Sequence, residues 1–335
     1  MRRVGAIPDP SKCRVQLREF PDSRGMKTKA PISSCALSGP ASDAKAARRP
    51  GRRRAWRTGA PGQTTRTVGV SVMDQPIFDL NGKVALVTGS AQGLGADIAT
   101  TLARQGARVI VSDVLEDLGR TTARAIQGAQ FVKHDVVSEP DWQRVVQFAV
   151  ETHGRLDLVV NNAGIEAFSL LENLTVEQFQ RVQKVNLEGT FLGTKWAIRA
   201  MKPGASSGHG GSIINISSLA GIVGTFGLSA YCAAKGGVRL LTKAAAIECA
   251  RLGYGIRVNS IHPAVVDGGM GKSVVKSLVD SGLAPDEHVA ESILASTHPM
   301  GFGKPKDVAD AVCFVASSHW MNGAELVLDG GASAQ

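Results

Sequence analysis

From Lys83 onward, the sequence alternates short apolar runs with longer stretches of helical periodicity. The runs are rich in Val, Ile and Leu, and they span residues 83–89, 107–113, 129–135, 156–164, 211–218, 254–263 and 324–331. Strands of this kind are buried on both faces, and strands separated by helices form a parallel sheet. Right-handed crossovers then give a doubly wound sheet whose ligands bind at the carboxyl ends of the strands. The sequence therefore predicts a single-domain α/β fold.

The stretches between these runs predict helices. They reach from the turn after residue 89 to about 105, and cover about 116–127, 139–153, 174–202 with a break near Asn186, 228–252 and 305–317. Residues 264–303 depart from the alternation and contain two helical pieces with Gly and Ser. An insertion beside the strand edge is where a helical substrate lid lies, although an ordinary connecting loop has the same pattern.

Residues 1–72 differ in composition from the rest of the chain. They hold 16 Lys and Arg against 4 Asp and Glu, with seven Pro and seven Gly, whereas residues 73–335 hold 22 against 25. A segment this basic and Pro-rich cannot bury enough apolar surface to order itself. We interpret it as a disordered leader before the catalytic domain at 73–335, or as an extension upstream of a start at Met73. An organelle-targeting role and a nucleic-acid-binding arm are weaker alternatives.

The remaining composition restricts location and partners. The five cysteines (13, 35, 232, 249 and 313) show no metal spacing, and an odd number fits reduced thiols in the cytoplasm. No apolar run reaches the ~18 residues that span a membrane. The seven histidines show no paired ligand spacing, so no metal is expected. The nearly neutral body predicts no nucleic-acid-binding face.

A glycine-rich turn, TGSAQGLG at 88–95, joins the first strand to the first helix. Gly89 permits the tight turn, Gly93 allows a pyrophosphate to approach, and Gly95 lets the helix pack on the strand. Free N–H groups at the helix N-terminus then bind the phosphates. In this strand–turn–helix context the motif indicates a dinucleotide site in a Rossmann-type sheet.

Asp113 ends the second strand, 18 residues after Gly95. An acid near this offset hydrogen-bonds the adenosine ribose 2′-OH, and its charge repels a 2′-phosphate. Ala91, Gln92 and Val114 supply no compensating cation. The pattern favours NAD over NADP, although an Asp at a strand end also caps helices.

Tyr231 and Lys235 lie one helical turn apart in AYCAAKGG. Residues at i and i+4 share a helix face, so the ammonium can lie near the phenol. A nearby cation favours phenolate and lowers a pKa that is about 10 for a free tyrosine. Acid–base work at neutral pH requires such a lowering. The pair alone is common, and its meaning depends on the other motifs.

Taken together, TGSAQGLG, Asp113, NNAG at 161–164, Asn186, Ser217-Ser218 and Tyr231-x-x-x-Lys235 resemble the short-chain dehydrogenase/reductase family, from about Leu80 to Gly331. NISSLAG, NSIHP and NGAELVLDGG are most similar to bacterial hydroxysteroid and cyclic-alcohol dehydrogenases. The resemblance implies that Tyr231 is the general acid–base and that Lys235 lowers its pKa and holds the nicotinamide ribose. It implies that Ser218, rather than Ser217, binds the substrate oxygen and that Asn186 anchors a water beside Lys235.

The resemblance also implies a set of cofactor contacts. Beside the catalytic pair Tyr231 and Lys235, these residues are Gly89, Gln92, Gly93, Leu94, Gly95, Asp113, Asp135, Val136, Asn162, Ala163, Gly164, Pro263 and Val266. Three positions depart from the family pattern: Ala264 replaces Gly, Gly268 replaces Thr and Phe302 replaces Arg. The family further implies a homotetramer or a dimer, with Phe191 and Trp196 in the core or at a subunit contact.

Three functions follow as hypotheses. The first is an NAD-dependent oxidoreductase that interconverts a secondary alcohol and a ketone, with a hydroxysteroid-like or alicyclic substrate, because residues 221–230 are apolar and lack Lys and Arg. The second is a 3-oxoacyl thioester reductase, for which Lys272 and Lys276 would receive an acidic carrier. The third is a non-catalytic NAD-sensing protein, which has no need of the Tyr231 phenol.

Overall fold

The computed structural model describes residues 16–21, 27–32 and 78–334, with side chains from 78 onward. The chain divides into two compact units, Met1–Gly69 and Val70–Gln335. In the first unit, β1 (Gln16–Pro21) pairs antiparallel with β2 (Lys27–Ile32). The rest of the predicted leader, including the proposed start at Met73, lies outside the described residues, so the leader stays a prediction.

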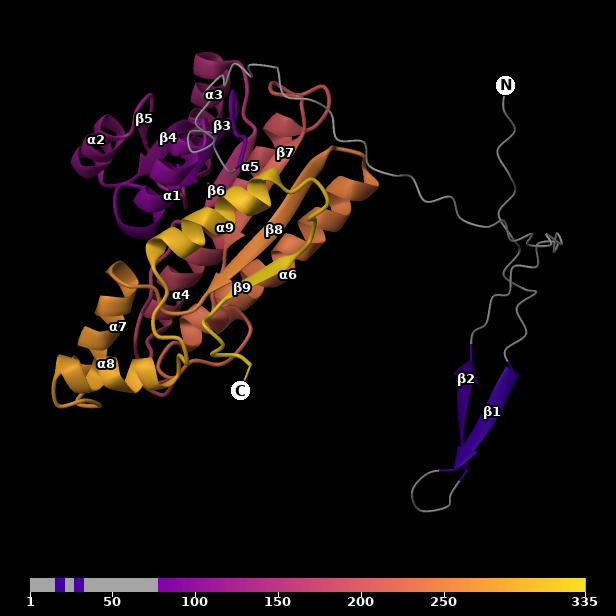
Figure 1. The fold of residues 1–335 in the computed structure, drawn as a ribbon, viewed down its shortest axis with the longest axis vertical. Coiled ribbons are helices and arrows are strands. Elements are labelled where there is room, and N and C mark those ends of the chain that lie inside the picture. Colours follow the sequence, from indigo (N-terminus) through magenta and orange to yellow (C-terminus); the bar gives the residue numbers. More distant parts are fainter. Residues whose placement is uncertain (1–15, 22–26, 33–77, 335) are drawn as a thin grey trace, which may run out of the picture. The chain divides into compact units, whose positions relative to one another are not determined.

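The second unit contains a seven-stranded parallel sheet in the order β5-β4-β3-β6-β7-β8-β9 (Figure 1). The strands are β3 (Val84–Thr88), β4 (Arg108–Asp113), β5 (Gln130–Lys133), β6 (Leu158–Asn161), β7 (Gly211–Ile216), β8 (Ile256–Pro263) and β9 (Glu325–Leu328). The five residues of β3 are all buried, as a strand covered on both faces requires. The predicted α/β doubly wound fold is confirmed.

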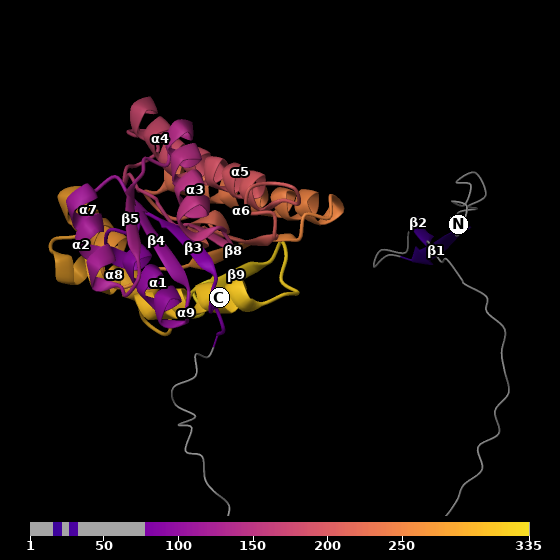
Figure 2. The ribbon, with the colours of Figure 1, turned by 90° about the horizontal axis from the view of Figure 1, so that it is seen from above.

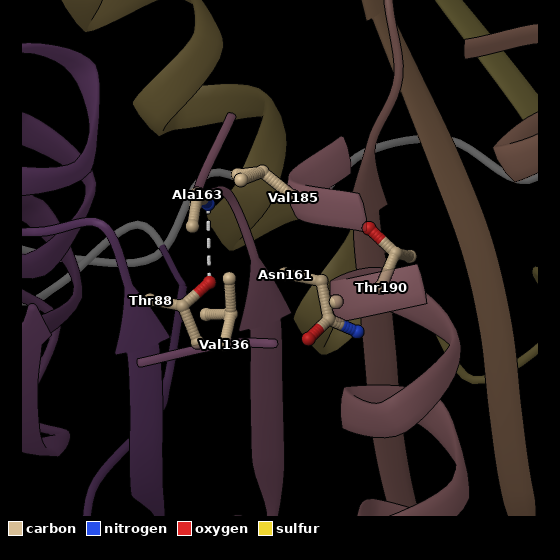
Figure 3. A pocket seen from close by; sticks show the side chains of 7 residues that line it. Thr88, Val136, Asn161, Ala163, Val185 and Thr190 are labelled. Carbon is tan, nitrogen blue, oxygen red and sulfur yellow. Dashed lines mark hydrogen bonds between the residues drawn. The ribbon is translucent and has the colours of Figure 1, made fainter. Parts of the chain in front are cut away.

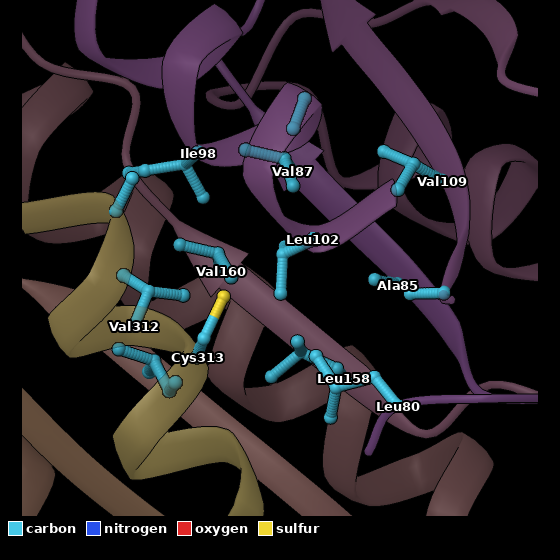
Figure 4. Close-up of a cluster of buried hydrophobic side chains, with 14 of the residues drawn as sticks. Leu80, Ala85, Val87, Ile98, Leu102, Val109, Leu158, Val160, Val312 and Cys313 are labelled. Atoms are coloured by element: carbon cyan, nitrogen blue, oxygen red, sulfur yellow. The ribbon is translucent and has the colours of Figure 1, made fainter. Parts of the chain in front are cut away.

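Helices cover both faces of this sheet (Figure 2). One face packs against α1 (Gly93–Arg104), α2 (Glu116–Ala125) and α9 (Pro305–Ser317). The other packs against α3 (Glu139–His153), α5 (Gly189–Met201) and α6 (Ser229–Arg251). Figure 4 shows the first core, where Leu102 of α1 and Val312 of α9 meet Val160 of β6.

The strand order reverses beside β3. From β3 the chain goes outward to β4 and β5, then returns across to β6 on the other side. The connections after β3 and β6 therefore diverge, and a crevice forms at the carboxyl ends of these strands. The glycine-rich turn and NNAG follow β3 and β6, so both motifs lie at this reversal point.

The predicted helix break near Asn186 has a specific form. The chain passes from α4 (Val176–Gln183) through a π-helical turn (Lys184–Glu188) into α5 without leaving the helical course. The Asn186 amide group donates to the carbonyl of Ile165 (2.7 Å) and accepts from its N–H (2.8 Å). This pair of bonds ties the wider turn to the loop after β6. Such π-turns are frequent at functional sites.

The insertion at 264–303 forms α7 (Gly269–Asp280) and α8 (Glu287–Ser296), and both lie beyond the carboxyl ends of the strands (Figure 1). The two helices share a small core of their own, which includes Val275, Leu278 and Ala290. Phe168 of the loop after β6 packs on this core and also on the cluster around Tyr231. One aromatic ring therefore joins the insertion to the predicted active site.

Candidate active site

The glycine-rich turn places backbone N–H groups at the strand edge. Gly89 has φ +61°, and a Cβ added there would meet the Cα of Ala163 at 2.7 Å. A Cβ on Gly95 would meet the carbonyl oxygen of Gly89 at 2.2 Å, so α1 packs against the turn only because this residue is Gly. No side chain caps α1, and its first turn carries no acidic residue. These features fit a pyrophosphate at the helix N-terminus.

Asp113 is buried at the end of β4, and its carboxylate contacts the glycine-rich turn. One oxygen accepts from the N–H of Ala91 (2.9 Å), and the other accepts from the N–H of Leu115 (3.1 Å). The bond to Leu115 is a local turn between residues two apart, and it does not cap α2, whose N-cap is Leu115. The bond to Ala91 fixes the carboxylate beside the predicted phosphate-binding turn. A carboxylate has about four acceptor positions, so capacity remains for a ribose hydroxyl.

The predicted adenine and ribose contacts lie at the ends of β5 and β6. Asp135 is exposed, and Val136 lines a small pocket with Thr88, Asn161, Ala163, Val185, Gly189 and Thr190 (Figure 3). The Thr88 hydroxyl accepts from the N–H groups of Asn162 (3.0 Å) and Ala163 (3.1 Å). The Asn162 amide in turn donates to the carbonyl of Thr88 (2.9 Å). The NNAG turn is thus held on β3 by its own hydrogen bonds.

Lys235 is buried on α6, and its ammonium group donates to the carbonyl of Ile216 at the end of β7 (2.7 Å). A Cβ added at Gly164 would lie 3.6 Å from Nζ and 3.3 Å from the Asn186 side-chain oxygen. The structure therefore brings Lys235, Gly164 and Asn186 together, as the predicted site requires. Burial lowers the pKa of Lys235 to about 8.

The two serines after β7 occupy different environments. The Ser217 hydroxyl is buried and donates to the carbonyl of Lys235 (3.0 Å). The Ser218 hydroxyl lies near the carbonyl of Pro263 (3.4 Å) and forms a hydrogen bond with Tyr231. Of these two hydroxyls, only that of Ser218 hydrogen-bonds the phenol, the neighbour that its implied role requires.

The predicted direction of the Tyr231 pKa is wrong for this geometry. Burial raises the pKa of Tyr231 to about 12, the hydrogen bond with Ser218 opposes this, and the charge of Glu166 raises the pKa further. The Lys235 ammonium lies 5.5 Å from the ring centroid but donates to Ile216 instead. The spacing of Tyr231 and Lys235 says nothing about the dielectric that surrounds both groups, and that dielectric dominates.

Pro263 ends β8 and is followed by the three positions that depart from the family pattern. Ala264 donates its N–H to the carbonyl of Leu328 (2.9 Å). Gly268 has φ +93° immediately before α7, a conformation that L side chains rarely adopt. Phe302 packs edge-on against His298, with ring centroids 5.5 Å apart. Gly268 therefore allows the chain to enter α7 with a positive φ.

Val266 bridges to Gly303 in parallel register. The carbonyl of Val265 accepts from Gly303 (3.0 Å), and the N–H of Asp267 donates back to it (2.8 Å). In a parallel bridge of this kind, the N–H and C=O of the central residue point to the opposite side. The backbone groups of Val266 therefore point away from Gly303 and are available for the cofactor contact that the resemblance implies.

Two residues that the sequence analysis did not identify join the site. Glu166 lies on the loop after β6, and its Oε1 accepts from the Ser273 hydroxyl of α7 (2.6 Å). His262 is buried at the end of β8; its Nδ1 lies 3.1 Å from the carbonyl of Ser218, and its Nε2 lies 2.8 Å from the Ser260 hydroxyl. Glu166 follows β6 in the sequence, and His262 is the second-last residue of β8. A position near the carboxyl end of a strand is the sequence signal that could have identified them.

The part of the chain that the structure describes contains no group of three His, Cys, Asp or Glu that could hold a metal ion. None of its helices is long and apolar enough to cross a membrane. The site brings together a phenol, a hydroxyl and a buried ammonium at the strand edge, next to a turn that fits a dinucleotide. Such a set can hold a carbonyl or carbinol oxygen and move one proton.

Known proteins resemble this chain over nearly the whole second unit. A family model described as short chain dehydrogenase matches residues 83–278. The NADP-dependent (R)-specific alcohol dehydrogenase of Lentilactobacillus kefiri is 38% identical over 76% of this chain and 98% of its own length. The trans-4-hydroxycyclohexanecarboxylate dehydrogenase of Sinomonas cyclohexanicum is 40% identical over 75% and 93%. The 3-alpha-(or 20-beta)-hydroxysteroid dehydrogenase of Mycobacterium tuberculosis (strain ATCC 25618 / H37Rv) is 38% identical over 76% and 91%.

The family model covers more than half of the chain, and each of these relatives is matched over most of its length. The match includes every motif that lies between the glycine-rich turn and Lys235. The chain belongs to the short-chain dehydrogenase family, whose members are oxidoreductases that use a nicotinamide cofactor.

Proposed function

We propose that this protein is an NAD-dependent dehydrogenase that interconverts a secondary alcohol and a ketone on an alicyclic or hydroxysteroid-like substrate. The observation that carries the proposal is the group formed by Ser218, Tyr231 and Lys235 at the carboxyl edge of the sheet. A protein that only senses NAD has no use for a buried phenol beside a serine hydroxyl.

Each residue of the site has a distinct role in the proposed reaction. Bound NAD supplies the acceptor for the hydride of the carbinol carbon. Ser218 donates a hydrogen bond that holds the substrate oxygen, while the deprotonated Tyr231 (phenolate) takes its proton in the oxidative direction and the protonated phenol returns one in the reductive direction. Lys235 holds the nicotinamide ribose, the carbonyl of Ile216 keeps its ammonium group in place, and Asn186 anchors a water beside it.

The preference for NAD is supported by Asp113. Its carboxylate is fixed next to the glycine-rich turn by the Ala91 N–H. A 2′-phosphate would meet this negative charge, and the nearby cations Arg120 and Lys133 are paired with Glu116. The relative from Lentilactobacillus kefiri is named as NADP-dependent, so the cofactor has to be measured for this chain.

The substrate class is supported by the apolar surroundings of Tyr231. Its cluster includes Leu228, Ala230 and Phe168, and the stretch 221–230 that leads into α6 contains no Lys or Arg. Relatives are named for cyclic alcohols and hydroxysteroids. We also propose that the protein works in the cytoplasm as a homotetramer or dimer, on the family resemblance and the cysteine pattern.

A spectrophotometric assay at 340 nm tests the proposal. NAD is offered with hydroxysteroids, cyclic alcohols and linear secondary alcohols, and NADH with the matching ketones, with NADP(H) in parallel. We expect turnover of one alicyclic or steroid class with NAD. Tyr231→Phe should reduce it by about 10²–10⁴-fold, the usual contribution of a general acid–base, while NADH binding persists. Cys232→Ser, at the neighbouring position, is the matched control and should retain activity.

Two other outcomes would change the function. Turnover with NADPH alone would contradict the argument from Asp113 and favour a 3-oxoacyl thioester reductase. NADH binding with no turnover of any alcohol or ketone would favour the NAD-sensing alternative.

A further inference from the structure

A carboxylate that the proposed reaction does not use lies beside Tyr231. Glu166 follows the NNAG turn, and its negative charge acts on the phenol. Its Oε1 accepts from Ser273 of α7, but its Oε2 is buried and has no hydrogen-bond partner. Within residues 78–334, Glu166 forms no ion pair with a Lys, Arg or His. A buried carboxylate oxygen without a donor is unusual, because its desolvation is not compensated.

The loop that carries Glu166 is fixed on both sides. The Asn186 side chain bonds both the N–H and the C=O of Ile165, the preceding residue. Downstream, Ser169 donates its N–H to the carbonyl of Gly227 (2.9 Å). Glu166 is therefore on a fixed loop, between the Tyr231 cluster and α7 of the insertion.

We propose that Glu166 is a specificity-determining residue whose unpartnered oxygen accepts a hydrogen bond from a second donor group on the substrate. The donor is a hydroxyl or a protonated amine, carried by the same ring as the reacting carbinol. This inference rests on the proposed function. It selects diols and amino alcohols, and it rejects alcohols that carry a carboxylate, because two negative charges would be buried together. The chain then differs from the relative that is named for trans-4-hydroxycyclohexanecarboxylate.

Cyclohexanol and three of its derivatives test the inference, with the value for the diol halved because it carries two carbinol centres. They are cyclohexanol and its 4-hydroxy, 4-amino and 4-carboxylate derivatives, with the 3-substituted isomers included because the second donor can lie at either position. The value of kcat/KM with NAD is measured for the wild type, Glu166→Gln and Ser273→Ala. Gln keeps the size of Glu166 and can still accept from Ser273, whereas Ser273→Ala removes the bond to α7 and keeps the charge.

We expect the wild type to prefer a diol or amino alcohol over cyclohexanol by about tenfold, the factor that one hydrogen bond to a charged group gives. It should prefer cyclohexanol over the carboxylate by a similar factor. Glu166→Gln should bring the amino alcohol to within about twofold of cyclohexanol and raise the carboxylate, while Ser273→Ala should preserve the wild-type order. If the wild type prefers only the amino alcohol over cyclohexanol, the charge of Glu166 causes the preference. If it prefers the diol equally, a hydrogen bond to Glu166 causes it.

Two results overturn the inference. One is a wild type that treats cyclohexanol, the diols and the amino alcohols within about twofold. The other is an equal change, in Ser273→Ala and Glu166→Gln, of the kcat/KM ratio between the substituted alcohols and cyclohexanol. Glu166 would then only hold α7 in position through Ser273. If neither these alcohols nor any hydroxysteroid is turned over, the proposed function fails by itself. Calorimetric binding of the amino alcohols and cyclohexanol to the NADH-bound protein then decides: a preference lost in Glu166→Gln supports the inference, and equal binding overturns it.

Discussion

Lys235 shows how strongly burial governs the chemistry of single residues here. Its ammonium group is almost completely buried, and a carbonyl is its only hydrogen-bond acceptor among the described residues. Because desolvation disfavours the charged form, its pKa falls to about 8. An unfolded chain exposes the same group to water, where it remains protonated up to about 10.4. Between these values the unfolded chain binds more protons than the folded chain.

This difference predicts how stability depends on pH. Stability rises with pH wherever the unfolded state binds more protons, so the Lys235 contribution should improve as pH increases from about 8 to 10. Lys235→Met removes that contribution, which amounts to at most ~3 kcal/mol in the free energy of unfolding. Urea unfolding at several pH values in this window, for wild type and variant, measures the difference.

The quantity to compare is the difference in stability between wild type and Lys235→Met at each pH. Tyr231 and Cys249 are buried in both proteins, and their titration also changes the stability of both at alkaline pH. Their raised pKa values make stability fall at high pH. Lys184→Met, at an exposed lysine, is the control and should run parallel to the wild type. Parallel curves for wild type and Lys235→Met would contradict the assignment of a depressed pKa to Lys235.

At the residue scale, the sequence predicted the members of the site better than their properties. The family resemblance, carried by the ordered set of motifs, implied Ser218, Tyr231 and Lys235 as the catalytic set, and the structure brings these three residues together. Glu166 escaped notice because a single acid after NNAG has no pattern that distinguishes it from a solvated loop residue. The raised pKa of Tyr231 depends on tertiary burial, which no local spacing records.

At the element scale, the predicted strands and helices agree with the structure because local signals and burial point the same way. For α3, the Ser138 hydroxyl accepts from the N–H of Asp141 (3.3 Å) and Gly154 ends the helix with φ +74°. Both are sequence-readable signals. The π-helical turn at 184–188 was predicted only as a break, because Asn186 forms it through bonds to Ile165, a residue 21 positions away.

The entry into α7 gives a prediction at this scale. Gly268 has φ +93°, and an added Cβ there would meet no atom within 4 Å. Restoring the family residue with Gly268→Thr therefore introduces backbone strain rather than a collision. We expect a loss of about 1–3 kcal/mol in stability, or a shifted α7 with weaker NAD binding, measured by thermal unfolding and by calorimetric titration with NAD.

The control is Gly224→Thr, because Gly224 also has open space around a Cβ but no positive φ. It should leave the melting temperature and NAD affinity nearly unchanged. Tighter NAD binding by Gly268→Thr, with unchanged stability, would show that the hydroxyl matters more than the backbone conformation.

At the scale of the whole molecule, α5 and α6 expose large apolar side chains. Phe191 is 45% exposed, Leu240 65% and Ile247 54%. Exposed apolar residues on neighbouring helices are typical of a subunit contact. An oligomer was expected from the family resemblance alone, because the sequence does not show which of these side chains are exposed.

Leu240→Asp should therefore shift the protein toward monomers, because an ionised carboxylate would be buried in the contact. Size-exclusion chromatography with light scattering, at several protein concentrations, measures the mass. Leu171→Asp is the matched control, since Leu171 is 74% exposed on the loop before α4, outside α5 and α6. An unchanged mass for Leu240→Asp would place the subunit contact elsewhere, and a monomeric wild type would remove the need for one.

The pairing of β3 with β6 also affects the chain while it is being synthesised. At the start of the two strands, the N–H of Val84 donates a hydrogen bond to the carboxylate of Asp157, a residue 73 positions away. At the usual rate of about 5–20 residues per second, a ribosome needs roughly 4–15 s to supply the second strand after the first. During that interval β3 is an apolar strand with one open edge, the kind of surface that pairs with other chains. The nascent polypeptide therefore needs protection before its dinucleotide site exists, and crowded, rapid expression should favour inclusion bodies over active enzyme.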